Sequence, residues 1–271
     1  MARRSPLLSV RRMETQWEIV QSGPADAQRT VLLLPGGMCS AESWAEVMAE
    51  PALAGARLVA VTLPGQAGTP APDDPSVEWF ARSTAELAKE LGADVVVGFS
   101  MGAVVAYEMV VTGAFVGPVV LTSLTLSSPD EPGFFRGLVR LTWVLGRLPM
   151  SVLKKGAGSM VKHAPLPPER RVELGAQFAR NDTRHMGQAL RRYIRWLAVD
   201  DDRAQRLADA GVPAWVVHAE KGDGGLTPHE RSVLEACPQV RVVTIPGKVF
   251  FLPNEVPGVV ADVVAEALAA V

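Results

Sequence analysis

The chain has few cysteines, few histidines and little net charge, and each shortage excludes a class of protein. Two cysteines among 271 residues are too few for a disulfide framework, and their spacing gives no Cys-x-x-Cys motif. A reducing, cytoplasmic setting is therefore expected. The formal net charge is -2 and charged residues make up 21% of the chain. No basic excess is available to hold a nucleic-acid backbone, so nucleic-acid binding is not expected.

Long hydrophobic runs are also missing. No stretch approaches the roughly 20 uninterrupted apolar residues of a transmembrane helix. Residues 1–12 are basic but lack the apolar run of a secretory signal, and we expect them to form a disordered leader. The four histidines include no pair with zinc-site spacing, so we expect no metal and no other cofactor. Oligomeric state has no signature in the sequence.

What the chain does have is 48% hydrophobic residues, enough for one large core. Apolar runs alternate with helical patterns at 76–91 and 257–270, and this alternation is typical of a mostly parallel sheet with helices on both faces. We therefore predict an α/β fold. The predicted strands lie near residues 16–20, 31–34, 57–61, 94–97, 118–124, 213–218 and 240–245.

Residues 98–102 read Gly-Phe-Ser-Met-Gly and follow a Val-rich predicted strand. A G-x-S-x-G element in this position indicates a sharp strand-to-helix turn that presents its serine, so Ser100 is a candidate nucleophile. The helix predicted to start there would direct free N–H groups and positive potential at the serine oxygen. The alternative is a Gly/Ser turn without chemistry.

Together with three further segments, this motif resembles the α/β-hydrolase family. Residues 31–37 with Ser43-Trp44 resemble its oxyanion loop, residues 58–68 its next strand and Pro-Gly turn, and residues 216–223 the strand whose exit loop carries the acid of a Ser/Asp/His triad. The resemblance implies a core formed by 13–129 and 210–271, with a helical lid inserted at 130–209.

The resemblance assigns roles to further residues. The oxyanion hole would use the amide of Met101 and that of Gly37, or of Met38 if the register differs by one. The acid would be Asp223, because ligand sites gather at the carboxyl ends of parallel strands. Asp130 and Glu131 are alternative acids, or ordinary solvated loop residues.

The pattern fails at the histidine. The family's base lies about five residues before a Glu-x-Pro element, and that position holds Phe250. A phenyl ring cannot accept the serine proton or deliver it to a leaving group, so the triad is expected to be degenerate. A substitute base would have to be one of the four histidines. For each of them an ordinary packing or surface role is the simpler interpretation. They are His163, His185, His218 and His229.

Two apolar segments fall in the predicted lid. The first, within 134–148, contains Phe134, Phe135 and Trp143, and the second spans 183–199. Both suit the cover of a hydrophobic pocket, although the first also fits a membrane-surface helix or a dimer contact. The residues expected to line the pocket are Met38, Phe134, Phe135, Trp143, Phe250 and Phe251.

The sequence therefore favours a serine hydrolase of an ester, thioester or lactone of a partly hydrophobic small molecule, with turnover impaired at Phe250. One alternative is a binding protein that has kept the fold and pocket without turnover. Another is a lyase or isomerase that uses the pocket with other groups.

Overall fold

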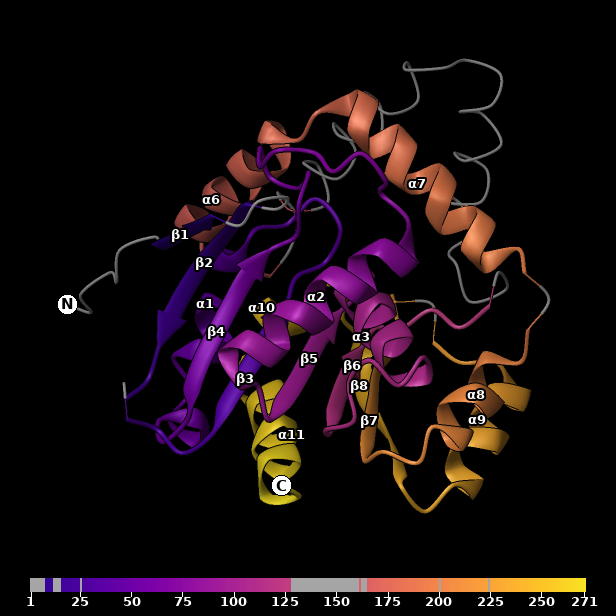
Figure 1. Cartoon of the computed structure of the whole chain (residues 1–271). Helices are drawn as coiled ribbons and strands as arrows, with labels where there is room; N and C mark the ends of the chain where they lie inside the picture. The colour runs from indigo at the N-terminus through magenta and orange to yellow at the C-terminus, as the bar shows by residue number, and fades with distance from the viewer. Residues whose placement is uncertain are drawn as a thin grey trace.

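A computed structural model describes residues 8–11, 16–24, 26–127, 161, 165–199, 201–223 and 225–271. Eight strands form one sheet in the order β1-β2-β4-β3-β5-β6-β7-β8 (Figure 1). Among the described strands, β2 pairs antiparallel with both β1 and β4 and the other pairings are parallel, so the predicted α/β class with a mostly parallel sheet is confirmed. The strands are β1 (Leu8–Arg11), β2 (Gln16–Ser22), β3 (Thr30–Leu34), β4 (Arg57–Thr62), β5 (Val95–Phe99), β6 (Val119–Thr122), β7 (Ala214–Lys221) and β8 (Val240–Lys248).

Helices connect the strands. They are η1 (Ala41–Trp44), α1 (Ala45–Met48), η2 (Pro51–Leu53), α2 (Val77–Leu91), α3 (Met101–Val111), α6 (Pro168–Arg180), α7 (Thr183–Leu197), α8 (Arg203–Asp209), α9 (Pro228–Ala236), α10 (Leu252–Glu255) and α11 (Pro257–Ala269). Local signals set several of their ends. Ser76 caps α2 by accepting from the amide of Trp79, and Gly92 ends that helix in the left-handed conformation.

The core consists of two apolar layers, one on each face of the sheet. Central strands such as β5 are buried on both faces, which explains their nearly continuous valines. Side chains of one pleat face, including Leu32 and Leu34, pack with α2, α3 and the segment that contains α8 and α9. Those of the other face, including Val31 and Leu33, pack with α1 and α11. The sheet is thus packed between helices on both faces, and these layers support its carboxyl edge.

The first strand corrects one prediction. Residues Leu8–Arg11 pair antiparallel with β2, in a register that places Leu8 opposite Ile19 and Arg11 opposite Gln16. The expectation of a disordered leader through residue 12 is therefore wrong for this segment. Its Leu-Ser-Val-Arg alternation has the period of a strand, and the short connection to β2 allows a hairpin.

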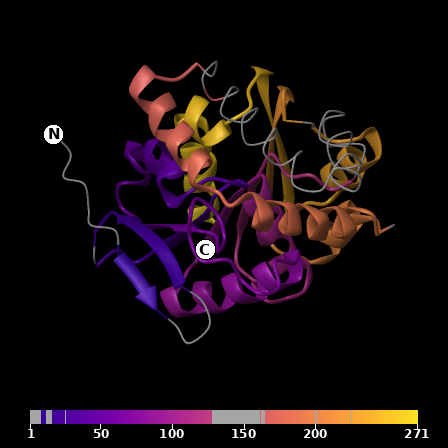
Figure 2. The same cartoon turned by 90° about the horizontal axis from the view of Figure 1, so that it is seen from above.

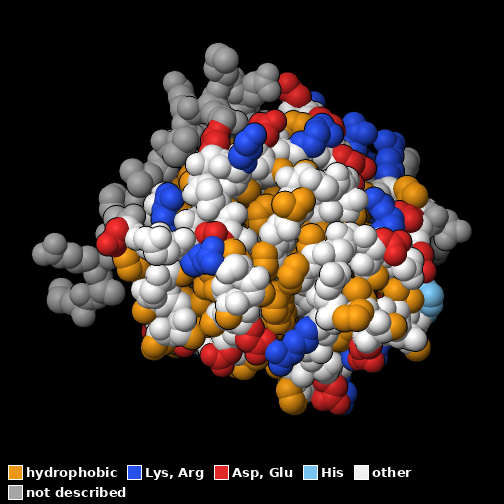
Figure 3. All heavy atoms as spheres, turned by 60° about the horizontal axis from the view of Figure 1, so that its bottom comes forward, with side chains coloured by type: hydrophobic (Ala, Val, Ile, Leu, Met, Phe, Trp, Pro, Cys, Tyr) orange, Lys and Arg blue, Asp and Glu red, His pale blue; other side chains and the backbone are white. Residues whose placement is uncertain are grey.

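Helices α6 and α7 lie above the carboxyl ends of the parallel strands (Figure 1), and the view from above shows the chain turning sharply between them (Figure 2). These helices belong to the segment predicted as a lid. The opposite side of the molecule, seen in Figure 3, mixes acidic, basic and hydrophobic side chains. None of the helices in the described part of the chain has the length and apolar character needed to cross a bilayer.

Candidate functional site at the carboxyl edge of the sheet

Ser100 lies in a strained turn between β5 and α3. Its φ of 50° and ψ of −112° are uncommon for a residue with a side chain, and such strain tends to be retained where it serves function. The turn requires both flanking glycines. A Cβ on Gly98 would lie 2.3 Å from the carbonyl oxygen of Gly102, and one on Gly102 would lie 2.2 Å from that of Leu34. The side chain of Ser100 is exposed above the sheet edge.

The loop after β3 runs directly beside this turn. A Cβ built on Gly36 would lie 3.6 Å from Cβ of Ser100, and one built on Gly37 would lie 3.8 Å from Cβ of Met101. Met101 opens α3, so its amide has no acceptor within the helix. No hydrogen bond within the described residues uses the amide of Gly37. Two backbone donors therefore lie near the serine.

The amide of Met38 is committed elsewhere. It donates to Oε1 of Gln66 at 2.7 Å, and Met38 itself adopts a left-handed φ of 69°. Of the two candidates that the sequence left open for this loop, Gly37 is the one whose amide is available to a ligand.

Asp223 lies in the exit loop of β7 and is partly held by hydrogen bonds. Its Oδ2 accepts from the amide of Ala219 at 2.8 Å and from the hydroxyl of Ser123 at 3.1 Å. Oδ1 is buried and has no hydrogen-bond partner in the described part of the chain. Burial raises the pKa of Asp223, although the hydrogen bonds from the Ala219 amide and the Ser123 hydroxyl oppose the shift. The carboxyl group thus has one oxygen anchored and one left unpaired.

Phe250 lies between β8 and α10, where its own amide and that of Phe251 donate to Oε1 of Glu255 at 3.0 and 2.8 Å. Glu255 therefore shapes this turn. Phe250 is 36% exposed, and the Lys248 ammonium lies 5.0 Å from the centroid of its ring. A phenyl ring has no lone pair that could accept the serine proton.

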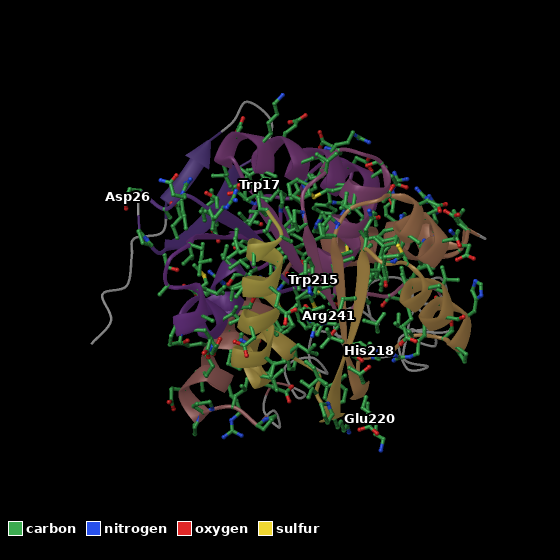
Figure 4. The ribbon with its side chains drawn as sticks, turned by 90° about the horizontal axis from the view of Figure 1, so that it is seen from below. Trp17, Asp26, Trp215, His218, Glu220 and Arg241 are labelled. Atoms are coloured by element: carbon green, nitrogen blue, oxygen red, sulfur yellow. The ribbon has the colours of Figure 1, made fainter. Side chains whose placement is uncertain are left out.

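Three of the four histidines lie within described residues. His218 is buried on β7 (Figure 4), and its Nε2 is 2.7 Å from Nη2 of Arg231 and 3.2 Å from Oγ1 of Thr244. Since a guanidinium only donates, this nitrogen acts as acceptor and is engaged. His229 pairs on the surface with Asp202 at 2.8 Å.

His185 is the third. It is 3% exposed, and neither of its ring nitrogens has a hydrogen-bond partner among the residues described. Its Nε2 lies against Gly65, where an added Cβ would approach to 2.0 Å. Burial lowers the pKa of His185, and the charge of Asp182 opposes the shift. His163 falls outside the described residues.

The predicted pocket is described in part. Met38 and Phe251 border a buried apolar cluster that includes Cys39 and Phe178, with the rings of Phe178 and Phe251 in edge contact at 6.5 Å between centroids. The remaining expected pocket residues and alternative acids lie outside the described residues: Phe134, Phe135, Trp143, Asp130 and Glu131. No group of three potential metal ligands occurs in the described ranges.

Several residues at this edge were missed by the sequence reasoning. Ser123 holds Asp223, Gln66 holds Met38, and Asn181 bonds both neighbouring loops, donating to the carbonyl of Met38 and accepting from the amide of Ala67. Only Gln66 had a signal, since it lies in the Pro-Gly turn that resembles the family pattern.

Comparison with known proteins identifies a family. A sequence profile described as the alpha/beta hydrolase family matches residues 31–263. A hydrolase from Pseudomonas aeruginosa PA01 has TM-score 0.74 at 16% identity, covering 97% of this chain and 98% of that one. A thermophilic esterase from Thermogutta terrifontis has TM-score 0.73 at 19% identity, covering 98% and 99%. A thioesterase domain from the curacin biosynthetic pathway has TM-score 0.68 at 20% identity, covering 96% and 98%. No curated protein matches the chain.

Proposed function

We propose that this chain, which belongs to the alpha/beta hydrolase family, is a serine hydrolase acting on an ester, thioester or lactone of a partly hydrophobic small molecule. The observation that carries the proposal is the strained, exposed Ser100 beside the amides of Gly37 and Met101, for which the described part of the chain supplies no acceptor. The similar folds of an esterase and a thioesterase domain support this reaction class. We also propose a cytoplasmic setting, on the strength of the low cysteine content.

In the first step the Ser100 oxygen would bond to the substrate carbonyl carbon, and the carbonyl oxygen would take the negative charge. The amides of Gly37 and Met101 would stabilise that oxyanion. Collapse of the intermediate breaks the bond to the alcohol or thiol oxygen or sulfur, which takes up the proton that Ser100 lost on attack; in a lactone the new hydroxyl stays on the acyl chain. Water then releases the acyl group from Ser100. In a complete triad a histidine carries the proton in both steps.

Impaired turnover is the second part of the proposal. By its spacing from Glu255, Phe250 holds the sequence position expected for that histidine. Among the described residues, the buried Oδ1 of Asp223 has no donor such as an imidazole N–H would supply. Without the base, acylation is slow and any acyl-enzyme is long-lived. Oxyanion stabilisation and binding alone can still leave about 10³–10⁴-fold acceleration over water.

A non-catalytic ligand-binding role is the second candidate. It is favoured by the same Phe250, since an aromatic side chain there adds apolar surface and removes proton transfer. In that case the fold would retain Ser100 and Asp223 as parts of a binding pocket.

The test is intact-mass spectrometry after incubation with a fluorophosphonate and, separately, a p-nitrophenyl acyl ester. Three proteins are compared: the chain as it stands, Phe250→His, and Phe250→His combined with Ser100→Ala. We expect fast labelling and turnover only in Phe250→His, and their loss with Ser100→Ala. Slow single acylation of the unaltered chain at Ser100 agrees with impaired turnover.

One outcome would contradict the hydrolase proposal, and another would contradict only its second part, impaired turnover. If Phe250→His neither reacts nor turns over, while it still binds acyl ligands as tightly as the unaltered chain, the binding role is favoured. If the unaltered chain turns over rapidly through Ser100, another base is present, and His185 and His218 become the residues to replace.

A further inference from the structure

One face of α6 is bonded along its length to the segment that follows the oxyanion loop. Its buried positions are Arg170, Leu174, Gln177 and Phe178, with spacings that place them on one side of the helix. Near the start of the helix, Arg170 donates to the carbonyl of Glu42 at 2.6 Å. Nearer its end, Oε1 of Gln177 accepts from the amide of Ser40 at 3.4 Å. The helix is thus aligned with residues 38–46.

The last residue of this series is Asn181, at the corner between α6 and α7. It is 1% exposed. Its Nδ2 donates to the carbonyl of Met38 at 2.8 Å, and its Oδ1 accepts from the amide of Ala67 at 2.8 Å. Further bonds from Nδ2 to the carbonyls of Gln177 and Phe178, at 3.1 and 3.2 Å, tie the amide to its own helix. One buried side chain therefore joins the helix corner, the loop after β3 and the loop after β4.

Met38 is consequently held from both sides. Asn181 binds its carbonyl, and Gln66 binds its amide. Its left-handed φ of 69° is unfavourable for a residue with a side chain, so the conformation needs support from its surroundings. Release of the Met38 carbonyl would let the backbone of this residue relax. The change would pass through the Gly37–Met38 peptide and the flexible Gly37 to the Gly36–Gly37 peptide, which carries the Gly37 N–H.

We propose that Asn181 is the positioning residue of the oxyanion hole: by holding the Met38 carbonyl it fixes the direction of the Gly37 amide toward the carbonyl oxygen bound at Ser100. The effect of Asn181 on catalysis rests on the function proposed above, whereas its effect on the conformation of the Met38 loop does not. Asn181 touches no reacting atom. It acts through Met38, and it makes the geometry of the hole depend on the α6–α7 corner.

The first test measures conformation without activity, by residue-resolved amide hydrogen exchange. In Asn181→Ala we expect the amides of Met38 and Ala67 to exchange at least about tenfold faster, because each loses support for its hydrogen-bonded conformation. Asn181→Asp keeps an acceptor for Ala67 but loses the donor to Met38, so fast exchange should be confined to the Met38 loop. Unchanged exchange at Met38 in both variants would overturn the proposal.

Asn254→Ala is the matched control. Asn254 is also a buried asparagine, and its Nδ2 donates to the carbonyl of Ser43 at 2.9 Å and to Oε2 of Glu46 at 2.9 Å. It contacts the same chain segment beyond the loop. Exchange at Met38 should stay within about twofold of its original rate in this variant. Equal acceleration in both asparagine variants would indicate general loosening and would also overturn the proposal.

The second test measures catalysis in the Phe250→His background. Asn181→Asp should lower kcat and the rate of fluorophosphonate labelling by about 10- to 100-fold, with KM changed little, since a small misplacement of an oxyanion donor mainly affects the transition state. Gln66→Leu should have a similar effect, and the two changes should be less than additive because both act on Met38. A selective rise in KM with full kcat would refute positioning.

The two hypotheses can fail separately. If Phe250→His shows no Ser100 reactivity, the proposed function fails, and hydrogen exchange still decides whether Asn181 holds the loop. If Phe250→His is active and Asn181→Asp is equally active, the proposed function stands and the positioning role is refuted.

Discussion

Replacing Arg170 by methionine should lower the free energy of unfolding by about 3 kcal/mol. Arg170 is the first contact along the α6 face described above, and its side chain is 10% exposed. Nε lies 2.5 Å from Oε1 of Glu46 and Nη2 lies 3.1 Å from Oε2, a bidentate pair. Nη1 lies 3.0 Å from Oε2 of Glu173, and Nη2 also donates to the carbonyl of Glu42.

The magnitude follows from what the substitution leaves behind. Removing one partner of a buried ion pair costs about 3–5 kcal/mol. The lower end applies here because the Glu46 side chain is 25% exposed and keeps a hydrogen bond from Nδ2 of Asn254. Methionine retains most of the apolar stem, so little packing is lost. For a chain of this length the change corresponds to a fall in Tm of about 5 °C.

Urea unfolding followed by circular dichroism would measure the effect, with Arg184→Met as control. Arg184 is an exposed arginine on α7, and its loss should change stability by no more than about 0.5 kcal/mol. Adding Glu46→Gln to Arg170→Met should cost less than the sum of the two single changes, because the uncompensated charge disappears. A loss below about 1 kcal/mol for Arg170→Met, or strict additivity in the double variant, would refute the reasoning.

Three further predictions concern buried groups. Because burial lowers the pKa of His185, the unfolded chain binds its proton more readily, and stability should fall as pH drops below about 6.5. His185→Leu should flatten that slope in urea titrations between pH 7.5 and 5, and an unchanged slope would contradict the assignment. Burial raises the pKa of Cys39 to about 12, so iodoacetamide at pH 8 should modify the partly exposed Cys237 and spare Cys39. Peptide mapping would show which cysteine is labelled. Early labelling of Cys39 would contradict the burial of the apolar cluster that contains Cys39 and Phe178. Gly98→Ala should destabilise the fold by about 3 kcal/mol in thermal melts, since its Cβ would meet the backbone of Gly102. A neutral result would mean that the turn adjusts freely.

The sequence pattern of neighbouring residues predicted the strands and helices well, because the hydrophobic period and the turn residues that define them lie close together in the chain. Apolar runs gave the strands, and the G-x-S-x-G element placed Ser100 between a strand and a helix, as the structure shows. The leader prediction failed at Leu8–Arg11, where a four-residue alternation was overlooked. The spacing to Glu255 assigned Phe250 to the position expected for the histidine, and this assignment stays a prediction. The structure shows that the amides of Phe250 and Phe251 donate to that glutamate.

The sequence by itself determined the fold class and the candidate nucleophile, since hydrophobic period and glycine spacing are properties of neighbouring residues. Only the tertiary structure decided which loop amide is available, because the acceptor that occupies Met38, Gln66, lies 28 residues away. It likewise decided that His218 is engaged by Arg231 and that Asn181 reaches Met38 across 143 residues. A hydrogen bond depends on distances and directions set by the packing of whole elements, and no local pattern encodes them.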